Sequence, residues 1–142
     1  MAKIKKELTR GHRFACDPSL KRLLDKTSAD LNILAVFLFG SRARQEATPS
    51  SDWDICLVLS KEEDSPLAFS EKKISYQKDF PEFDIQILQQ LPLAIRRRIF
   101  AEGHVLFARD EDKLYELAYR FVREYELFRP YHESYLEAVA HG

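Results

Sequence analysis

The sequence predicts a small α/β (α+β) domain whose sheet has about four strands. The first observation is the wholly apolar run Ile33–Phe39, which is typical of a strand that is covered on both faces. The second is another apolar run at 55–59, which follows a short polar connection and therefore suggests a neighbouring strand. The third is a set of amphipathic helical patterns, at 17–32, 92–103 and 110–128, placed around these runs.

Composition places the chain among globular proteins. Its 142 residues are 45% hydrophobic and 32% charged, which is enough for one domain with one core and too apolar for a disordered chain. The formal net charge of −1 provides no overall attraction to nucleic acid, so no direct nucleic-acid binding is expected. We expect a single domain over residues 1–142, with a core at about 17–108 and a helical extension at about 110–140.

The sequence carries no pattern typical of secretion or membrane insertion. No apolar run approaches the roughly 20 residues of a membrane helix, and the basic segment 1–13 precedes no apolar stretch like that of a secretory signal. Cys16 and Cys56 form no CxxC or Cys/His cluster, so neither a zinc site nor a disulfide framework is indicated. These features predict a cytoplasmic protein with reduced thiols.

Local signals define the elements of the first half. Asp17 and Pro18 form a helix start, as N-cap and first helical residue, and this helix should end near Asn32. A second helix is expected at 66–78, although its apolar residues are only loosely patterned. The alternating segment 83–88 predicts a third strand.

The second half should hold two further helices and a short strand. Pro92 begins a helix that Gly103 should close, and 104–108 predicts a fourth strand at an edge of the sheet. The segment 110–128 carries a continuous apolar stripe and is the clearest helix of the chain. Pro130 should interrupt that helix, beyond which one or two more turns could form.

Two aspartates open the second predicted strand. Side chains alternate along a strand, so Asp52 and Asp54 should point to one face and Trp53 to the other, towards a covering helix. Two adjacent carboxylates repel each other unless a cation lies between them, and Mg²⁺ prefers such oxygen ligands. Asp84 could join them if its strand lies beside theirs. Asp-x-Asp pairs at strand ends also serve in turns and caps, so the third acid matters for a functional interpretation.

A small-residue turn follows the first predicted strand. Gly40 would let the backbone approach a phosphate closely, and the Ser41 hydroxyl with nearby amides could hold the terminal phosphates of a triphosphate. Arg42 and Arg44 flank this turn, where a guanidinium can pair with phosphate oxygens. Together with the three acids, the turn predicts a site for phosphoryl transfer, in which two metal ions can clamp the attacking and leaving oxygens.

These residues also resemble a known motif. The string Gly40-Ser41-Arg42-Ala43-Arg44, followed after Ser41 by ten residues and Asp52-Trp53-Asp54, resembles the minimal nucleotidyltransferase (MNT) branch of the DNA polymerase β-type nucleotidyltransferase superfamily. The resemblance continues through Asp84 and the segment 91–107, and covers about 20–107. At one position the sequence differs from the family, because Gln45 stands where glycine usually follows the second arginine.

The resemblance implies a polymerase β-like fold, a small mixed sheet with helices on one side. It also implies that Asp52 and Asp54 hold Mg²⁺, as two ions, with Asp84 as a third ligand. Asp84 would accept the proton of the attacking hydroxyl, and Gly40 and Ser41 would bind the triphosphate. The reaction would be attack on the α-phosphorus of a nucleotide, with pyrophosphate as the leaving group.

Many MNT proteins are antitoxins of HEPN-domain RNase toxins, and the family is known to transfer AMP from ATP to a tyrosine of the toxin. The resemblance therefore implies a type VII-like toxin–antitoxin pair. Two alternatives stay open: an antitoxin that neutralises its partner by binding alone, and a nucleotidyltransferase for a small-molecule acceptor. Partner contacts could come from C-terminal aromatic residues, among which packing within the domain is favoured for Phe121, Tyr125 and Phe128 and left open for Tyr131 and Tyr135.

Overall fold

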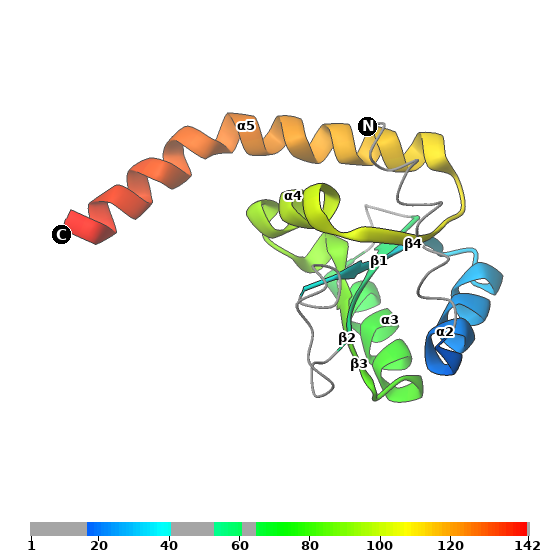
Figure 1. Ribbon diagram of the computed structural model, residues 1–142. Helices are drawn as coiled ribbons and strands as arrows, with labels where there is room; N and C mark the ends of the chain where they lie inside the picture. Colours follow the sequence, from blue (N-terminus) through cyan, green and yellow to red (C-terminus); the bar gives the residue numbers. More distant parts are fainter. Residues whose placement is uncertain (1–16, 41–52, 61–64, 142) are drawn as a thin grey trace.

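The structure, a computed structural model, describes residues 17–40, 53–60 and 65–141, with side chains up to residue 126 (Figure 1). Four strands form one mixed sheet in the order β3-β2-β1-β4. Both β2 and β4 pair antiparallel with β1, whereas β3 pairs parallel with β2. The strands are β1 (Ile33–Phe39), β2 (Trp53–Leu59), β3 (Phe83–Ile87) and β4 (His104–Ala108); the helices are α2 (Pro18–Ala29), α3 (Pro66–Asp79), a 3-10 turn (Leu88–Gln90), α4 (Leu93–Glu102) and α5 (Glu111–His141).

The predicted fold class and all four predicted strands are confirmed, but the helices cover both faces of the sheet (Figure 1). Helices α2 and α3 bury one face, around Val36, Leu38 and Ile55. Helices α4 and α5 bury the other face, around Phe37 and Cys56. The expectation of helices on one side was therefore wrong. The physical reason is the unbroken apolar run of β1, whose alternating side chains leave both faces in need of cover.

The helix boundaries follow the local signals closely. The Asp17 carboxylate accepts the backbone N–H of Leu20 at 3.0 Å, and Pro18 is the first helical residue. Gly103 closes α4, as predicted. The expected interruption at Pro130 was wrong, because α5 continues through it to His141. A proline removes one hydrogen bond and crowds the preceding turn, and the turns on either side of it can offset this local cost.

One arginine joins the end of α2 to the sheet. The Arg109 guanidinium donates to the carbonyl oxygens of Thr27, Ser28, Asp30 and Ile33, at 3.1, 2.8, 3.0 and 3.0 Å. It therefore ties the last turn of α2 and the residues that follow it to the start of β1; Thr27 and Asp30 also accept backbone N–H groups, from Asp30 and Ile33. No pattern in the sequence predicted this contact.

Within the described ranges, no helix has the length and apolar character needed to cross a membrane.

Asp30 ties the end of α2 to α3. Its carboxylate accepts from the Lys72 ammonium at 3.0 Å and from the Tyr76 hydroxyl at 2.9 Å, and also from the backbone N–H of Asn32. Burial alone would raise the pKa of the Asp30 carboxyl, but these hydrogen bonds outweigh burial and hold the pKa below its ordinary value of 3.8. The ionised form is therefore the one that stabilises the fold.

We expect Asp30→Asn to lower the free energy of unfolding by about 2 kcal/mol at pH 7, because the charge-assisted hydrogen bonds are lost. A lowered pKa stabilises the fold above the unfolded value, and the effect disappears as pH falls through the folded value. The gap between wild type and variant should thus narrow below pH 3.8. Urea unfolding at pH 7 and at lower pH measures both effects. Asp25→Asn, at an exposed position of α2, is the control and should show neither.

Candidate active site

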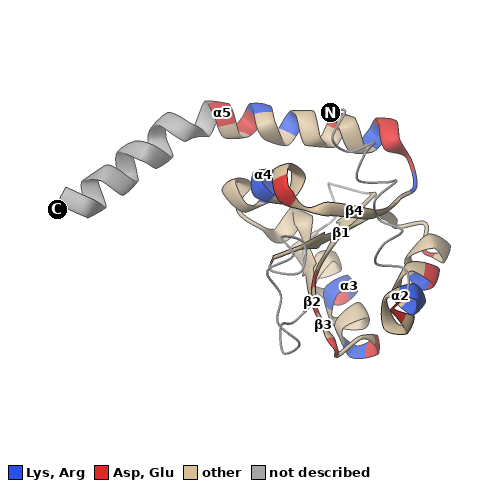
Figure 2. Cartoon of the chain, viewed as in Figure 1, with Lys and Arg blue, Asp and Glu red and all other residues tan. Residues whose placement is uncertain are grey.

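Strand register brings two of the three predicted acids side by side. Asp54 in β2 lies opposite Phe39 of β1 on one side and in register with Asp84 of β3 on the other. Neighbouring strands run about 4.8 Å apart. The side chains of Asp54 and Asp84 therefore project from adjacent positions, near the N-terminal ends of β2 and β3. Acidic residues accordingly mark both β2 and β3 in Figure 2. The condition under which Asp84 could join the other acids, namely that its strand lies beside β2, is met.

The acids lie on the face that α4 and α5 cover. Their strand neighbours Trp53, Ile55 and Phe83 belong to the core under α2 and α3, so Asp54 and Asp84 must leave from the opposite face. The Trp53 and Phe83 rings meet edge to face, with centroids 6.4 Å apart. This confirms that Trp53 points away from the acids and serves as core.

Gly40 lies against the Asp54 carboxylate. Its φ of +77° is in the left-handed region that favours glycine. A β-carbon built on Gly40 would lie 2.1 Å from Oδ2 of Asp54, far inside van der Waals contact. A hydrogen is therefore the only substituent that this position accepts while the carboxylate stays in place.

Asp84 is exposed at the edge strand and has an ordered neighbour. The Gln86 amide donates to Asp84 Oδ1 at 3.1 Å, and its oxygen accepts from the Lys73 ammonium at 3.2 Å. An ammonium only donates, so the amide oxygen must face Lys73 and the amide NH₂ must face Asp84. Sequence reasoning missed Gln86, although its spacing of two from Asp84 already placed both on one face.

Four of the predicted site residues lie outside the described residues: Ser41, Arg42, Arg44 and Asp52. Gln45 lies outside them as well. Within the part of the chain that is described, no group of three or more His, Cys, Asp or Glu residues gathers as a metal site. Two carboxylates on adjacent strands nevertheless fit a hard cation, because they supply the oxygen ligands that such ions prefer.

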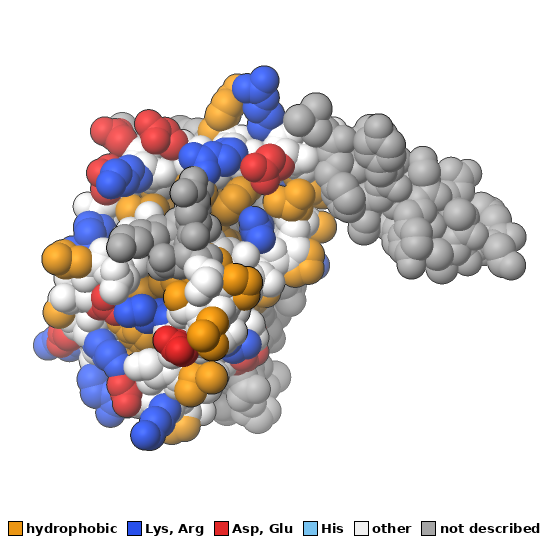
Figure 3. Space-filling model, turned by 180° about the vertical axis from the view of Figure 1, so that it is seen from behind, with side chains coloured by type: hydrophobic (Ala, Val, Ile, Leu, Met, Phe, Trp, Pro, Cys, Tyr) orange, Lys and Arg blue, Asp and Glu red, His pale blue; other side chains and the backbone are white. Residues whose placement is uncertain are grey.

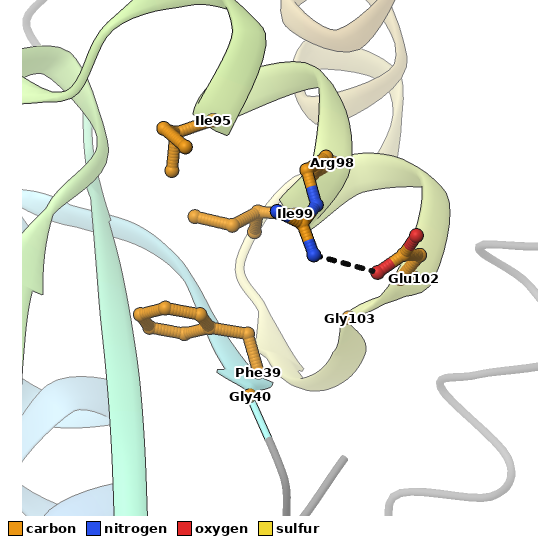
Figure 4. A pocket seen from close by; sticks show the side chains of 7 residues that line it. All are labelled: Phe39, Gly40, Ile95, Arg98, Ile99, Glu102 and Gly103. Atoms are coloured by element: carbon orange, nitrogen blue, oxygen red, sulfur yellow. Dashed lines mark ion pairs between the residues drawn. The ribbon is translucent and has the colours of Figure 1, made fainter. Parts of the chain in front are cut away.

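A cavity of about 220 Å³ lies next to these residues, between the end of β1 and α4 (Figure 4). Phe39, Ile95 and Ile99 give it apolar walls. At its rim the Arg98 guanidinium and the Glu102 carboxylate form an ion pair at 3.8 Å. The remaining lining residues are Gly40 and Gly103. Sequence reasoning missed this cavity, because it depends on how α4 packs against β1.

The family model described as "Polymerase beta, Nucleotidyltransferase" matches residues 19–112. The chain belongs to this nucleotidyltransferase family. The chain is also 35% identical over 89 residues to a protein of Methanocaldococcus jannaschii whose name ascribes to it adenylyltransferase activity on proteins. That alignment covers 63% of this chain and 66% of the archaeal protein, slightly less than two thirds of its length.

Solved structures of this nucleotidyltransferase family's fold include chains from toxin–antitoxin complexes. One complex contains AMP-PNP; its matching chain is 17% identical, with a TM-score of 0.65 over 86% of this chain and 96% of that one. Another is a tri-AMPylated Shewanella oneidensis HEPN toxin with its MNT antitoxin, at 16% identity and a TM-score of 0.60 over 84% and 94%. At these identities the likeness establishes the shared fold, and the polymerase β-like fold that the motif implied is confirmed.

We expect Gly40→Ala to destabilise the nucleotidyltransferase by about 3 kcal/mol, from the left-handed φ and the overlap with Asp54 together. Adding Asp54→Ala removes the overlap, so the double variant should lose at least about 1 kcal/mol less than the sum of the two single changes. Urea unfolding of the four proteins measures this coupling.

Gly103→Ala is the matched control. Its β-carbon would lie 2.6 Å from the backbone oxygen of Ile99, so it should also destabilise the protein. Because Asp54 is not involved in that overlap, combining Gly103→Ala with Asp54→Ala should give additive losses. Additive losses for Gly40→Ala and Asp54→Ala would contradict the proposed contact.

Proposed function

We propose that this protein is a Mg²⁺-dependent nucleotidyltransferase that transfers AMP from ATP to a tyrosine of a HEPN-domain toxin, and thereby acts as its antitoxin in the cytoplasm. The observation that carries the proposal is the register of Asp54 with Asp84 on adjacent strands, with Gly40 against Asp54. Membership of the nucleotidyltransferase family supports the reaction class. The name of the archaeal relative and the AMP-PNP and tri-AMPylated toxin of the structural neighbours support ATP, AMP transfer and a protein acceptor.

In this proposal Asp52, Asp54 and Asp84 hold the magnesium ions. When bound, Mg²⁺ neutralises phosphate charge and stabilises the pentavalent transition state. The acceptor hydroxyl approaches the exposed Asp84, which takes its proton. The tyrosine oxygen then forms a bond to the α-phosphorus while the bond to the β-phosphate oxygen breaks, so that pyrophosphate leaves. Gln86 keeps the Asp84 carboxylate oriented through Oδ1 during this step.

The turn after β1 is proposed to bind the triphosphate. Gly40 leaves the backbone accessible beside Asp54, and the positive φ of Gly40 changes the chain direction at the end of the strand. Ser41 supplies a hydroxyl, while Arg42 and Arg44 supply guanidinium groups that pair with phosphate oxygens. These groups counter the charge of the leaving pyrophosphate.

Helix α5 is proposed to contact the protein partner. Leu114, Leu117 and Phe121 of this helix are buried in the domain core. For Phe121 this agrees with the sequence analysis, which favoured packing within the domain. Tyr119 and Val122 on the same helix are 62% and 39% exposed. An aromatic and an aliphatic side chain at the surface suit the apolar centre of a protein interface. On the described part of the face in Figure 3, Lys and Arg side chains are interspersed with Asp and Glu, which suits a mixed-charge protein surface.

We expect the purified protein with labelled ATP and Mg²⁺ to transfer label to the protein encoded by the adjacent gene, which under this proposal carries a HEPN domain. Asp52→Asn/Asp54→Asn, and Asp84→Asn separately, should slow transfer by at least about 100-fold, because each removes a metal ligand or the proton acceptor. Asp25→Asn on α2 is the matched control and should leave the rate unchanged. Gel autoradiography and mass spectrometry of the acceptor tyrosine provide the measurement.

Three outcomes would contradict the proposal. Unchanged transfer by the double Asn variant would remove the acids from the mechanism. Toxin neutralisation that survives this variant, without any labelled toxin, would favour an antitoxin that acts by binding alone. Label on a small molecule instead of the HEPN protein would identify a different acceptor class.

A further inference from the structure

We propose that the cavity between the end of β1 and α4 binds the nucleobase of the substrate nucleotide. This inference rests on the proposed function, because it assigns one part of the same substrate to a place in the structure. It goes further in naming the residues that recognise the base: Phe39, Ile95, Ile99, Arg98 and Glu102.

The cavity adjoins the acidic site. Gly40 lines the cavity, and the same residue lies against the Asp54 carboxylate. Phe39, another lining residue, is the register partner of Asp54. A ligand whose phosphates lie beside Gly40 and Asp54 could therefore place its other end in the cavity.

The size of the cavity suits one end of a nucleotide. Its volume of about 220 Å³ lies below the roughly 300–1,000 Å³ of pockets that enclose whole small-molecule ligands. A planar ring system fits such a space, while the ribose and the charged phosphates would stay outside it. Phe39, Ile95 and Ile99 turn their side chains to the cavity (Figure 4), and an aromatic ring with two aliphatic side chains favours the faces of a base.

The rim supplies polar groups for the edge of the base. Arg98 and Glu102 form an ion pair at 3.8 Å, and their side chains are 58% and 53% exposed. This distance is longer than a hydrogen bond, and exposed pairs of this kind contribute little to stability. Both groups can therefore exchange the contact for a polar base edge, with Arg98 as donor and Glu102 as acceptor.

The position of Asp84 distinguishes the base from the other candidate occupant, an aromatic ring of the acceptor. The acceptor oxygen must lie near Asp84, and β3 is separated from β1 by β2. Two strand spacings amount to about 10 Å, so the cavity lies well away from the position of the attacking oxygen. The nucleotide side of the reaction is the better match.

The test compares ATP with inorganic tripolyphosphate, which has the phosphates and no base. Calorimetry with the full chain and Mg²⁺ measures both affinities. Ile95→Trp fills the cavity from a half-buried position, and should weaken ATP binding by about tenfold or more while leaving tripolyphosphate binding unchanged. Ile74→Trp, at a 65% exposed position on α3, is the matched control and should change neither affinity. Phe39→Leu removes the ring and provides a second variant, with the same selective loss expected.

Several results would overturn the inference. One is that both cavity variants weaken the affinity for ATP and the affinity for tripolyphosphate equally. Another is that both variants keep the wild-type affinity for ATP. A third is that the wild-type protein does not bind ATP. Unchanged ATP affinity with a raised KM for the protein acceptor would assign the cavity to the acceptor ring instead. The proposed function is judged separately by label transfer. A wild-type protein that binds ATP with this base dependence but transfers no AMP would contradict the function and leave the base site in place.

Discussion

The close contact of Gly40 with Asp54 is the constraint on which the rest of the site depends. A carboxylate that opens a strand and a backbone that leaves the neighbouring strand would normally be kept apart by a side chain. Here the missing β-carbon lets them meet, so the end of β1 and the start of β2 form one surface. The Asp54 carboxylate and the cavity beside α4 both adjoin this one residue.

Two elements, β3 and α4, lie on either side of this contact and supply different kinds of side chain. On one side β3 adds Asp84, oriented by Gln86 and through it by Lys73 of α3. On the other side α4 adds a mainly apolar wall with a charged rim. In the proposed function, the reaction would take place between a polar, exposed edge and an apolar pocket. This is the arrangement that a nucleotide needs, since one of its ends is charged and the other is an aromatic ring.

Sequence alone predicted the parts that depend on local patterns. The apolar run of β1 and the alternation in β3 predicted those strands, and the alternation of side chains along a strand predicted that Asp54 and Trp53 point to opposite faces. Contacts between a long side chain and a segment far away in the sequence could not be predicted, because no local pattern indicates them. The hydrogen bonds of Arg109 to carbonyl oxygens at and after the end of α2 are an example. The passage of α5 through Pro130 was missed because a helix of 31 residues outweighs one local breaker.

The parallel pairing of β2 with β3 determines at which stage of folding Asp54 and Asp84 come together. The β1–β2 pair is antiparallel and close in sequence, so Asp54 can meet Gly40 early. Asp84 must wait until α3 has crossed over and β3 has docked, because parallel pairs close long loops and form slowly. A chain emerging from the ribosome would thus bring Asp84 beside Asp54 only once this crossover is complete. If Asp84 is the proton acceptor, as proposed, partly folded forms would lack it and could not yet perform the transfer.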